Sequence, residues 1–312
     1  MDKINTVSII GLGAIGSYIA TSLQTVLGDN LRIIAGGERK TRIERDGVIA
    51  NGKPFFFNVI EPEAKTDYAD LAIIIPKFMG LRAAMADMKN QIGPDTIIIA
   101  PLNGVEAEEV VAEMYDANNI LYSLMMVSVV MQGNISRFDP DVSYIQFGEK
   151  KNVELSPRVR MIKELFEKAG IHVNIPKDMV KAIWLKYMIN VSENQTSAVL
   201  GLCYKAWNGC SPSADFVRHA LGNEVVAVAH AKGIEITAEN IKKHDELLKA
   251  LIPTNKTSML QDIEAKRPTE VEIFSGTMIH LGEKYGIPVP YNVLIYHCIK
   301  VLEEKNAGRF DT

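Results

Sequence analysis

The stretch that decides the fold reads TVSIIGLGAIG and runs from Thr6 to Gly16. Its first part, Thr6–Ile10, is a β-branched run that predicts a short buried strand. The glycines that follow are spaced as GxGxxG, and residues 17–26 predict a helix directly after them. A strand, a GxGxxG turn and a helix in this order are typical of a site for the pyrophosphate of a dinucleotide. The alternative is a glycine-rich turn that binds no ligand.

Each glycine of this turn has a physical role in dinucleotide binding. Gly11 permits the tight turn, Gly13 lets the pyrophosphate approach the backbone, and Gly16 lets the helix pack closely on the strand. The helix N-terminus adds unpaired N–H groups and a partial positive charge. We therefore predict that the whole turn contacts the cofactor: Gly11, Leu12, Gly13, Ala14, Ile15 and Gly16.

The segment after the second predicted strand, Leu31–Ala35, reads GGERK. NAD-binding proteins place an acidic residue here on the ribose 2′-hydroxyl, whereas an arginine nearby accommodates the 2′-phosphate of NADP. Glu38 can serve the hydroxyl, while Arg39, Lys40 or Arg42 can serve a phosphate, and all four can equally be solvated charges. The segment favours NAD, with NADP possible, and the predicted contacts are Gly36, Gly37 and Glu38.

Two further apolar runs, Leu71–Ile75 and Thr96–Ala100, predict buried parallel strands. Lys77 follows the first of them and Asn103 follows the second. Ligands of open α/β sheets bind beyond the carboxyl ends of the strands. We therefore expect Lys77 and Asn103 to lie at the same edge as the glycine turn, although either can be a plain polar residue at a strand end.

The remaining first half predicts a small hairpin around residues 48–59, and antiparallel strands between residues 121 and 148 that extend the same sheet. A helix over residues 156–169 and a closing strand over residues 170–175 follow. His172 is interpreted as a structural strand residue, and the methionines at 125, 126 and 131 as core residues. The Pro176-Lys-Asp sequence marks the predicted boundary between domains 1–176 and 177–312.

The second half predicts helices throughout, over residues 179–200, 215–232, 238–251, 258–266, 269–285 and 291–304. Lys186, Asn190 and Asn194 are four residues apart in the first of them and so share one helix face. An ammonium group and two amides suit an anionic, carbonyl-bearing ligand, and the alternative is a solvated face. Thr269 to Glu272 have the form of a capping box, which leaves Glu270 in the first turn of a helix.

Composition limits the class of protein. A chain of 312 residues with 47% hydrophobic content can bury two cores, and a net charge of −4 argues against nucleic-acid or membrane partners. The three cysteines have no metal-binding spacing, so we expect no metal site and a reducing compartment. The N-terminus has no signal-peptide pattern, and no apolar run reaches the length of a membrane span. These features predict a cytoplasmic protein.

Several motifs together resemble the ketopantoate reductase (2-dehydropantoate 2-reductase) family. The resemblance runs from the first strand to the last helix, and the lysine–asparagine helix and the SMLQD segment are its most specific parts. The landmarks are Gly11–Gly16, Lys77, Asn103-Gly104, Trp184 with Lys186, Asn190 and Asn194, Ser258–Asp262, and Thr269-Glu270.

The resemblance implies an α/β fold, with a Rossmann-like N-terminal domain and an all-helical C-terminal domain of the 6-phosphogluconate dehydrogenase type. It implies an active site in a cleft between them, in which a 2-oxo acid is reduced to a D-2-hydroxy acid by a nicotinamide cofactor. Lys186 would be the general acid and Glu270 its catalytic partner. Lys77 would lie near the nicotinamide, and Asn103 between cofactor and substrate. Asn190, Asn194 and Ser258 would hold the substrate.

Two departures from the family pattern bear on the substrate and the cofactor. Members that use NADPH commonly carry an arginine where this chain has Gly36, and members that reduce ketopantoate usually have Asn-Pro where this chain has Asn194-Gln195. We therefore expect an NAD-dependent D-2-hydroxy-acid dehydrogenase of the D-mandelate type that acts on an acid branched at C3. The alternative is an NADPH-dependent 2-dehydropantoate 2-reductase of pantothenate biosynthesis.

A hypothesis from another class is a dinucleotide sensor without catalysis. A sensor would be expected to lack Lys186 or Glu270, and both are present. We further expect a small-molecule acid as the substrate and a homodimer as the assembly.

Overall fold

The computed structural model describes residues 3–127, 129–207, 210–249 and 251–310. It contains two compact units, Met1–Val180 and Lys181–Thr312, which are described here one at a time. The division falls inside a helix, a few residues after the boundary expected at Pro176. The helix carries the chain directly from the first unit into the second, with no flexible linker sequence between them.

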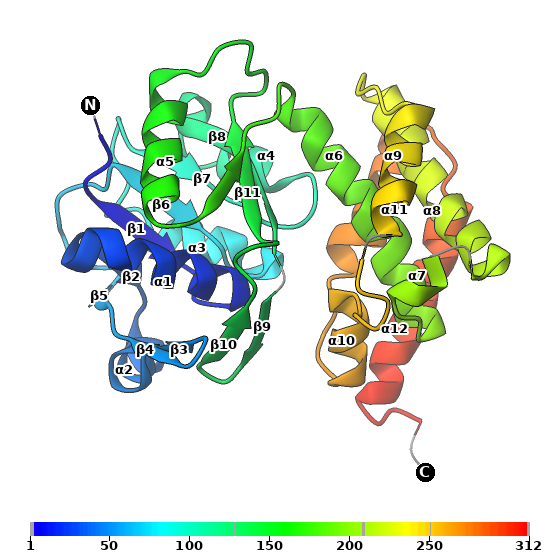
Figure 1. Cartoon of the computed structure of the whole chain (residues 1–312), viewed down its shortest axis with the longest axis horizontal. Helices are drawn as coiled ribbons and strands as arrows, with labels where there is room; N and C mark the ends of the chain where they lie inside the picture. Colours follow the sequence, from blue (N-terminus) through cyan, green and yellow to red (C-terminus); the bar gives the residue numbers. More distant parts are fainter. Residues whose placement is uncertain (1–2, 128, 208–209, 250, 311–312) are drawn as a thin grey trace. The chain divides into compact units, whose positions relative to one another are not determined.

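The first unit is built on an eight-stranded sheet (Figure 1). Strands β8, β7, β6, β1, β2 and β5 are parallel neighbours in that order, β11 pairs antiparallel with β8, and β12 closes the edge beside β11. The predicted Rossmann-like sheet is therefore confirmed. The strands are β1 (Val7–Ile10), β2 (Leu31–Ile34), β5 (Asn58–Ile60), β6 (Leu71–Ile74), β7 (Ile97–Ile99), β8 (Ile120–Met126), β11 (Tyr144–Gly148) and β12 (His172–Asn174).

The central strands are apolar on both faces because helices cover the sheet. Every residue of β1 and β6 is buried, and their register pairs Val7 with Leu71 and Ile10 with Ile74. Helix α1 packs against α5, and α3 packs against α4. The helical segments of the unit are α1 (Ala14–Leu27), η1 (Gly28–Asn30), α2 (Gly37–Asp46), η2 (Phe78–Gly80), α3 (Leu81–Asp87), α4 (Ala107–Val111), η3 (Ala117–Asn119) and α5 (Pro157–Lys168).

One expectation about the sheet is wrong. Strands β9 (Val129–Gln132) and β10 (Ile135–Phe138) do not extend the main sheet, but form a second sheet with β3 (Val48–Ala50) and β4 (Lys53–Phe55). Pairing of β10 with β3 joins segments far apart in sequence, so no local pattern reveals it. The expected hairpin around residues 48–59 is the β3–β4 pair, and His172 is an exposed residue of edge strand β12, as expected.

The second unit is helical, as predicted (Figure 1). Its first three segments form one continuous helix, in which the π-helical turn η4 lies between α6 and α7. The segments are α6 (Met179–Ile189), η4 (Asn190–Asn194), α7 (Gln195–Leu200), η5 (Tyr204–Trp207), α8 (Pro212–Ala231), α9 (Ala238–Leu248), α10 (Ser258–Glu264), the π-helical turn η6 (Glu272–Gly276), α11 (Thr277–Tyr285) and α12 (Pro290–Asn306).

The capping box expected at Thr269 is also wrong. The helix begins at Glu272, and the Glu272 carboxylate accepts hydrogen bonds from Tyr296 and Lys300 of α12 instead of capping its own helix. Thr269 likewise donates to Glu303 of α12, through its backbone N–H at 2.8 Å and its hydroxyl at 2.7 Å. The Thr269 hydroxyl still accepts a 3.3 Å hydrogen bond from the Val271 backbone N–H, but partners on α12 replace the glutamate half of the capping box.

None of the helices built from the described residues combines the length and the apolar character that crossing a membrane requires.

Candidate active site

The glycine turn has the close packing that its sequence predicts. Gly11 has φ +101°, and a Cβ there would lie 2.1 Å from the backbone oxygen of Ile75. A Cβ on Gly16 would lie 1.9 Å from the backbone oxygen of Gly11. A Cβ on Gly13, by contrast, would meet no atom within 4 Å. Two of these glycines are therefore required by the fold, whereas the space at Gly13 is open to a ligand.

Helix α1 begins at Ala14, earlier than the start expected at residue 17, and this places its N-terminus within the turn. Its N-cap, Gly13, has no side chain to bond the first N–H groups. Leu12, Ala14 and Ile15 surround that helix start and are half-buried. Unpaired N–H groups beside open space fit the pyrophosphate of a dinucleotide.

The segment after β2 carries mixed charge. Gly36 is the N-cap of α2, Gly37 is its first residue, and Glu38 lies exposed in its first turn. The ammonium group of Lys40 lies 3.4 Å from Glu61 and 3.9 Å from Glu44. Two partly exposed carboxylates therefore lie beside Lys40 and would compete with a 2′-phosphate for its ammonium group.

Lys77 and Asn103 follow neighbouring strands at the carboxyl edge of the sheet. Lys77 is the N-cap of η2 directly after β6, and Asn103 lies in the loop between β7 and α4. The register pairs Ile73 with Ile99, so both strands end near the same level as the glycine turn after β1. The structure thus brings together the predicted cofactor residues of the first unit.

In the second unit, Lys186 lies half-buried on α6. Burial lowers the pKa of its ammonium group to about 8, and the negative charge of Glu270 opposes part of that shift. The next residue, Tyr187, is fully buried and donates a 2.6 Å hydrogen bond to the backbone oxygen of Phe274 in η6. This bond ties the helix that carries Lys186 to the segment that follows Glu270.

The predicted substrate residues of this unit form one hydrogen-bonded group. The Asn194 amide donates to the Asn190 side-chain oxygen and to the Ser258 hydroxyl, both at 3.4 Å. Ser258 is the exposed first residue of α10. Nδ2 of Asn190 is buried and makes no hydrogen bond among the described residues. A buried amide donor of this kind fits an oxygen of an acidic ligand.

Residues around the π-helical turn η4 satisfy its backbone with their side chains. Ser192 donates to the Met188 carbonyl at 2.7 Å, Gln195 to the Val191 carbonyl at 2.8 Å, and Thr196 to the Ser192 carbonyl at 2.6 Å. In a π-helical turn the backbone bonds join residues five apart instead of four. The side-chain hydroxyl and amide groups named above therefore supply additional donors to backbone carbonyls in and beside the turn. Single π-helical turns within α-helices occur frequently at functional sites.

Sequence reasoning missed the residues that position the site. Tyr187 and Glu303 hold the segments around Lys186 and Glu270, through Phe274 and Thr269 respectively. A tyrosine inside an apolar helix was the available signal for Tyr187, because a buried hydroxyl requires a partner. The carboxylate of Asp262, a landmark of the SMLQD segment, pairs with Arg267 at 2.7 Å.

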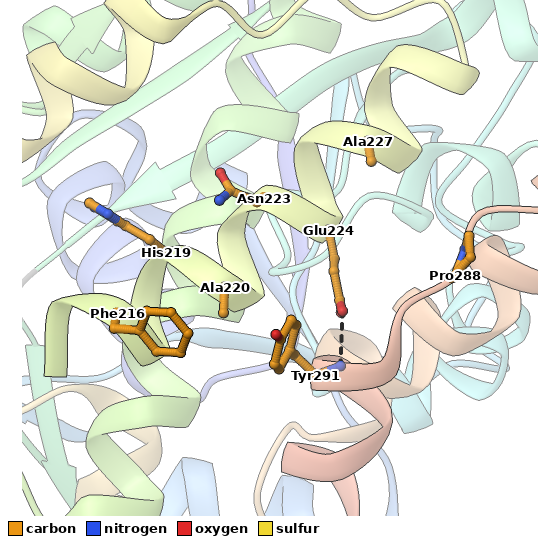
Figure 2. Close-up of a pocket in the computed structure, with 8 residues that line it drawn as sticks. All are labelled: Phe216, His219, Ala220, Asn223, Glu224, Ala227, Pro288 and Tyr291. Atoms are coloured by element: carbon orange, nitrogen blue, oxygen red, sulfur yellow. Dashed lines mark hydrogen bonds between the residues drawn. The ribbon is translucent and has the colours of Figure 1, made fainter. Parts of the chain in front are cut away.

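A pocket of the second unit, with a volume of about 360 Å³, lies elsewhere (Figure 2). Figure 2 shows Phe216 and Tyr291 among the residues that line it, and the Glu224 carboxylate accepting a hydrogen bond from the Tyr291 backbone. None of the predicted site residues lines it. Within the described part of the chain, no group of three or more His, Cys, Asp or Glu side chains is arranged to hold a metal ion.

With its open glycine turn between a strand and a helix, the chain has the features of a dinucleotide-binding protein. Its sequence matches the family described as ketopantoate reductase PanE/ApbA over residues 7–152, and the C-terminal region of the same family over residues 178–303. The chain belongs to the ketopantoate reductase family, which confirms the resemblance.

The relatives agree with this assignment over nearly the whole chain. The chain is 24% identical over 306 residues to 2-dehydropantoate 2-reductase of Streptococcus pyogenes serotype M6, which covers 95% of this chain and 97% of that protein. Its fold matches D-mandelate dehydrogenase solved with NADH and anilino(oxo)acetate, at a TM-score of 0.86, 22% identity and coverage of 97% and 99%. It also matches the dimeric ketopantoate reductase of Staphylococcus aureus, at a TM-score of 0.76, 20% identity and coverage of 96% and 99%.

Proposed function

We propose that this oxidoreductase reduces 2-dehydropantoate, or a closely similar branched 2-oxo acid, with a nicotinamide dinucleotide as hydride donor. The observation that carries the proposal is the lowered pKa of Lys186 in the electrostatic field of Glu270, on a helix that also presents Asn190 and Asn194. An ammonium group that loses its proton near neutral pH suits general-acid catalysis. The neighbouring amides and the Ser258 hydroxyl suit the carboxylate of the acid.

The proposed chemistry assigns one task to each residue. When bound, NADH or NADPH supplies a hydride to the carbonyl carbon. The Lys186 ammonium stabilises the charge that develops on the carbonyl oxygen and donates its proton to it, which yields the hydroxyl group. Glu270 raises the pKa of Lys186 and so keeps more of it in the acid form. Asn190, Asn194 and Ser258 hold the acid in place.

The relatives favour a different substrate from the one expected first. Sequence analysis favoured a D-mandelate-type dehydrogenase, but the curated relative from Streptococcus pyogenes, which spans nearly the whole chain, is a 2-dehydropantoate 2-reductase. The likeness to D-mandelate dehydrogenase, at 22% identity, supports the fold alone. We therefore put 2-dehydropantoate reduction first and D-2-hydroxy-acid dehydrogenation second.

The segment after β2 supports the second candidate, an NAD-dependent D-2-hydroxy-acid dehydrogenase. Glu38 lies in the first turn of α2, where its charge would repel a 2′-phosphate, and Lys40 is engaged by Glu61 and Glu44. A Cβ on Gly36 would lie 3.3 Å from the Pro62 side chain, so this position has little room for the arginine of NADPH-dependent members. These contacts favour NADH as the cofactor.

Four parallel assays of nicotinamide absorbance test the choice. NADH and NADPH are each supplied with 2-dehydropantoate and with the bulkier benzoylformate. Turnover of 2-dehydropantoate with a higher kcat/KM than benzoylformate supports the first candidate. The reverse preference, together with NADH, supports the D-2-hydroxy-acid dehydrogenase. Binding of a cofactor with no turnover of any branched 2-oxo acid supports the dinucleotide sensor.

Replacing Lys186 by alanine tests the catalytic assignment. We expect kcat to fall by about 100-fold or more, because the general acid is lost, while the Kd of the cofactor stays unchanged. Lys249→Ala is the matched control, since Lys249 forms an exposed ion pair with Glu246 on the same unit. Full activity of the Lys186→Ala variant would overturn the mechanism.

We also propose that the chain forms a homodimer. Large apolar side chains are exposed on two helices of the second unit, including Phe216 on α8 and Leu294 on α12, which are 66% and 63% exposed. Phe216 and Tyr291, one from each helix, line the same pocket, and a contiguous exposed apolar patch favours burial against another protein surface. Sedimentation at micromolar concentration tests the proposal, and a single species with the monomer mass of 34.5 kDa would contradict it.

A further inference from the structure

A buried charge cluster lies against the π-helical turn η4, and the proposed mechanism does not use it. Glu193 belongs to η4 and is only 2% exposed. Its carboxylate forms a hydrogen bond with Nε2 of His244 on α9 and lies 3.8 Å from Nη1 of Arg218 on α8. We call Glu193, His244 and Arg218 the Glu193 cluster.

Arg218 is itself held on several sides. Its guanidinium group lies 2.9 Å from the Asp245 carboxylate and 3.3 Å from that of Asp215. It also bonds the ring of His219 at 2.7 Å, and it lies over the ring of Trp207, with 5.9 Å to the centroid. Because Arg218 is 4% exposed and so restrained, it provides a fixed anchor for Glu193.

The Glu193 cluster holds η4 through contacts separate from those of the substrate residues. Glu193 extends to α8 and α9, whereas Asn194, the next residue, bonds Asn190 and Ser258 of α10. Loss of one partner from a buried charge pair leaves the other uncompensated, so the cluster resists rearrangement of the turn. Asn190 is the first residue of η4, and its Nδ2 is buried without a hydrogen-bond partner among the described residues.

We propose that Glu193 is a positioning residue, which fixes η4 through His244 and Arg218 and thereby orients Asn190 and Asn194 toward the 2-oxo acid. This inference rests on the proposed function, because it assumes that the two asparagines bind the acid. A helix turn with a non-standard hydrogen-bond pattern requires external contacts to persist. The Glu193 cluster supplies such contacts from two other helices.

The first test replaces Glu193 by glutamine, which keeps the size of the side chain and removes its charge. We expect the KM of the 2-oxo acid to rise about 10-fold, equivalent to about 1.4 kcal/mol of binding, because the amides lose their fixed orientation. The kcat and the KM of the cofactor should change little. An unchanged KM of the acid would overturn the proposal.

Glu224→Gln is the matched control. Glu224 is also a buried carboxylate of the second unit, 8% exposed, and accepts 2.9 Å hydrogen bonds from the backbone N–H groups of Tyr291 and Asn292. We expect both Glu193→Gln and Glu224→Gln to lower the Tm. Only Glu224→Gln should leave the KM of the acid unchanged. If both variants raise the KM of the acid equally, the effect is a general loss of stability and the proposal fails.

A double-mutant cycle tests the partner. His244→Gln alone should raise the KM of the acid, and the Glu193→Gln/His244→Gln double variant should raise it by less than the product of the two single effects. Independent, multiplicative effects would show that His244 does not act through Glu193, and would contradict this part of the proposal.

Hydrogen exchange gives a readout that needs no substrate. Backbone amides of residues 190–196 should exchange faster in Glu193→Gln than in the wild type or Glu224→Gln. If the wild type reduces no 2-oxo acid, the proposed function fails, and faster exchange still supports the structural role of Glu193. Unchanged exchange in these residues would overturn that role even if the enzyme is active.

Discussion

At the residue scale, the environment of Lys186 determines its chemistry. Burial removes water from the ammonium group and lowers its pKa to about 8, while Glu270 acts in the opposite direction. An exposed lysine would stay protonated far above neutral pH and would be a weaker acid catalyst. Burial therefore brings the pKa of Lys186 down to about 8, and the nearby carboxylate keeps it from falling further.

The pH dependence of the reaction follows from this value. In the proposed mechanism the reduction needs protonated Lys186, so its kcat/KM should fall as the pH rises through about 8, whereas oxidation of the hydroxy acid should speed up over the same range. In Glu270→Gln the opposing charge is lost, so the midpoint should move to lower pH. Initial rates measured at intervals of about one pH unit between about pH 6 and pH 10 give the midpoints of the wild type and of Glu270→Gln. A midpoint that moves upward in the variant would contradict the assignment.

Glu108 gives a prediction about stability. Burial raises the pKa of this carboxyl from 4.5 to about 7, against the opposing hydrogen bond from the Ser123 backbone. The folded state thus binds more protons than the unfolded state between these values, so the free energy of unfolding should fall as the pH rises from 4.5 to 7. Glu108→Gln should remove most of this slope, worth up to about 3 kcal/mol.

Urea unfolding at several pH values measures the effect. Glu109→Gln is the control, because Glu109 is the exposed neighbour of Glu108 on α4 and contributes least to the raised pKa of Glu108, so this variant should keep most of the wild-type slope. A Glu108→Gln variant with the wild-type slope would show that another group titrates in this range.

At the element scale, the glycines between β1 and α1 differ in what they do: one is required by the packing of the fold, and another leaves space for a ligand. Gly16 has no room for a Cβ because the backbone of Gly11 lies against it, whereas Gly13 faces open space. Both glycines belong to one sequence motif, yet the structure gives them different tasks.

Two alanine variants of the turn should therefore differ. Gly16→Ala should lower the free energy of unfolding by about 1–3 kcal/mol, because its Cβ collides with backbone. Gly13→Ala should cost less than about 1 kcal/mol of stability, while weakening cofactor binding by about 10-fold or more. Denaturant unfolding and cofactor titration measure the two effects. Equal loss of stability in both variants would contradict the assignment.

Local sequence patterns predicted most elements of this chain but not all of their partners. Strand β1 and helix α8 lie close to the expected positions, because apolar periodicity and N-caps are local signals. Strands β9 and β10 belong to a different sheet from the one predicted, and no capping box forms at Thr269, which bonds Glu303 of α12. The π-helical form of η4 was not predicted either, since side chains and distant helices stabilise it.

At the scale of the whole molecule, the cofactor should act as a stabilising ligand. At 100 times its Kd, NADH or NADPH should add about 2.7 kcal/mol to the free energy of unfolding, since it binds only the folded chain. Amide exchange should slow in the glycine turn and after strands β6 and β7, where Lys77 and Asn103 lie. Differential scanning calorimetry and hydrogen exchange measure this, with Gly13→Ala as the control. Protection elsewhere, without protection of the glycine turn, would contradict the assigned site.

The sequence by itself determined the glycine turn, the individual apolar strands of the first half, and the helix that carries Lys186, Asn190 and Asn194. These features depend on contacts between residues near one another in the chain, so their spacing is enough to predict them. The tertiary structure decided which strands share a sheet, what holds Thr269 and Glu193, and how far the pKa of Lys186 is lowered. These depend on burial and on partners brought together by packing, as with Glu193 and His244, which are 51 residues apart.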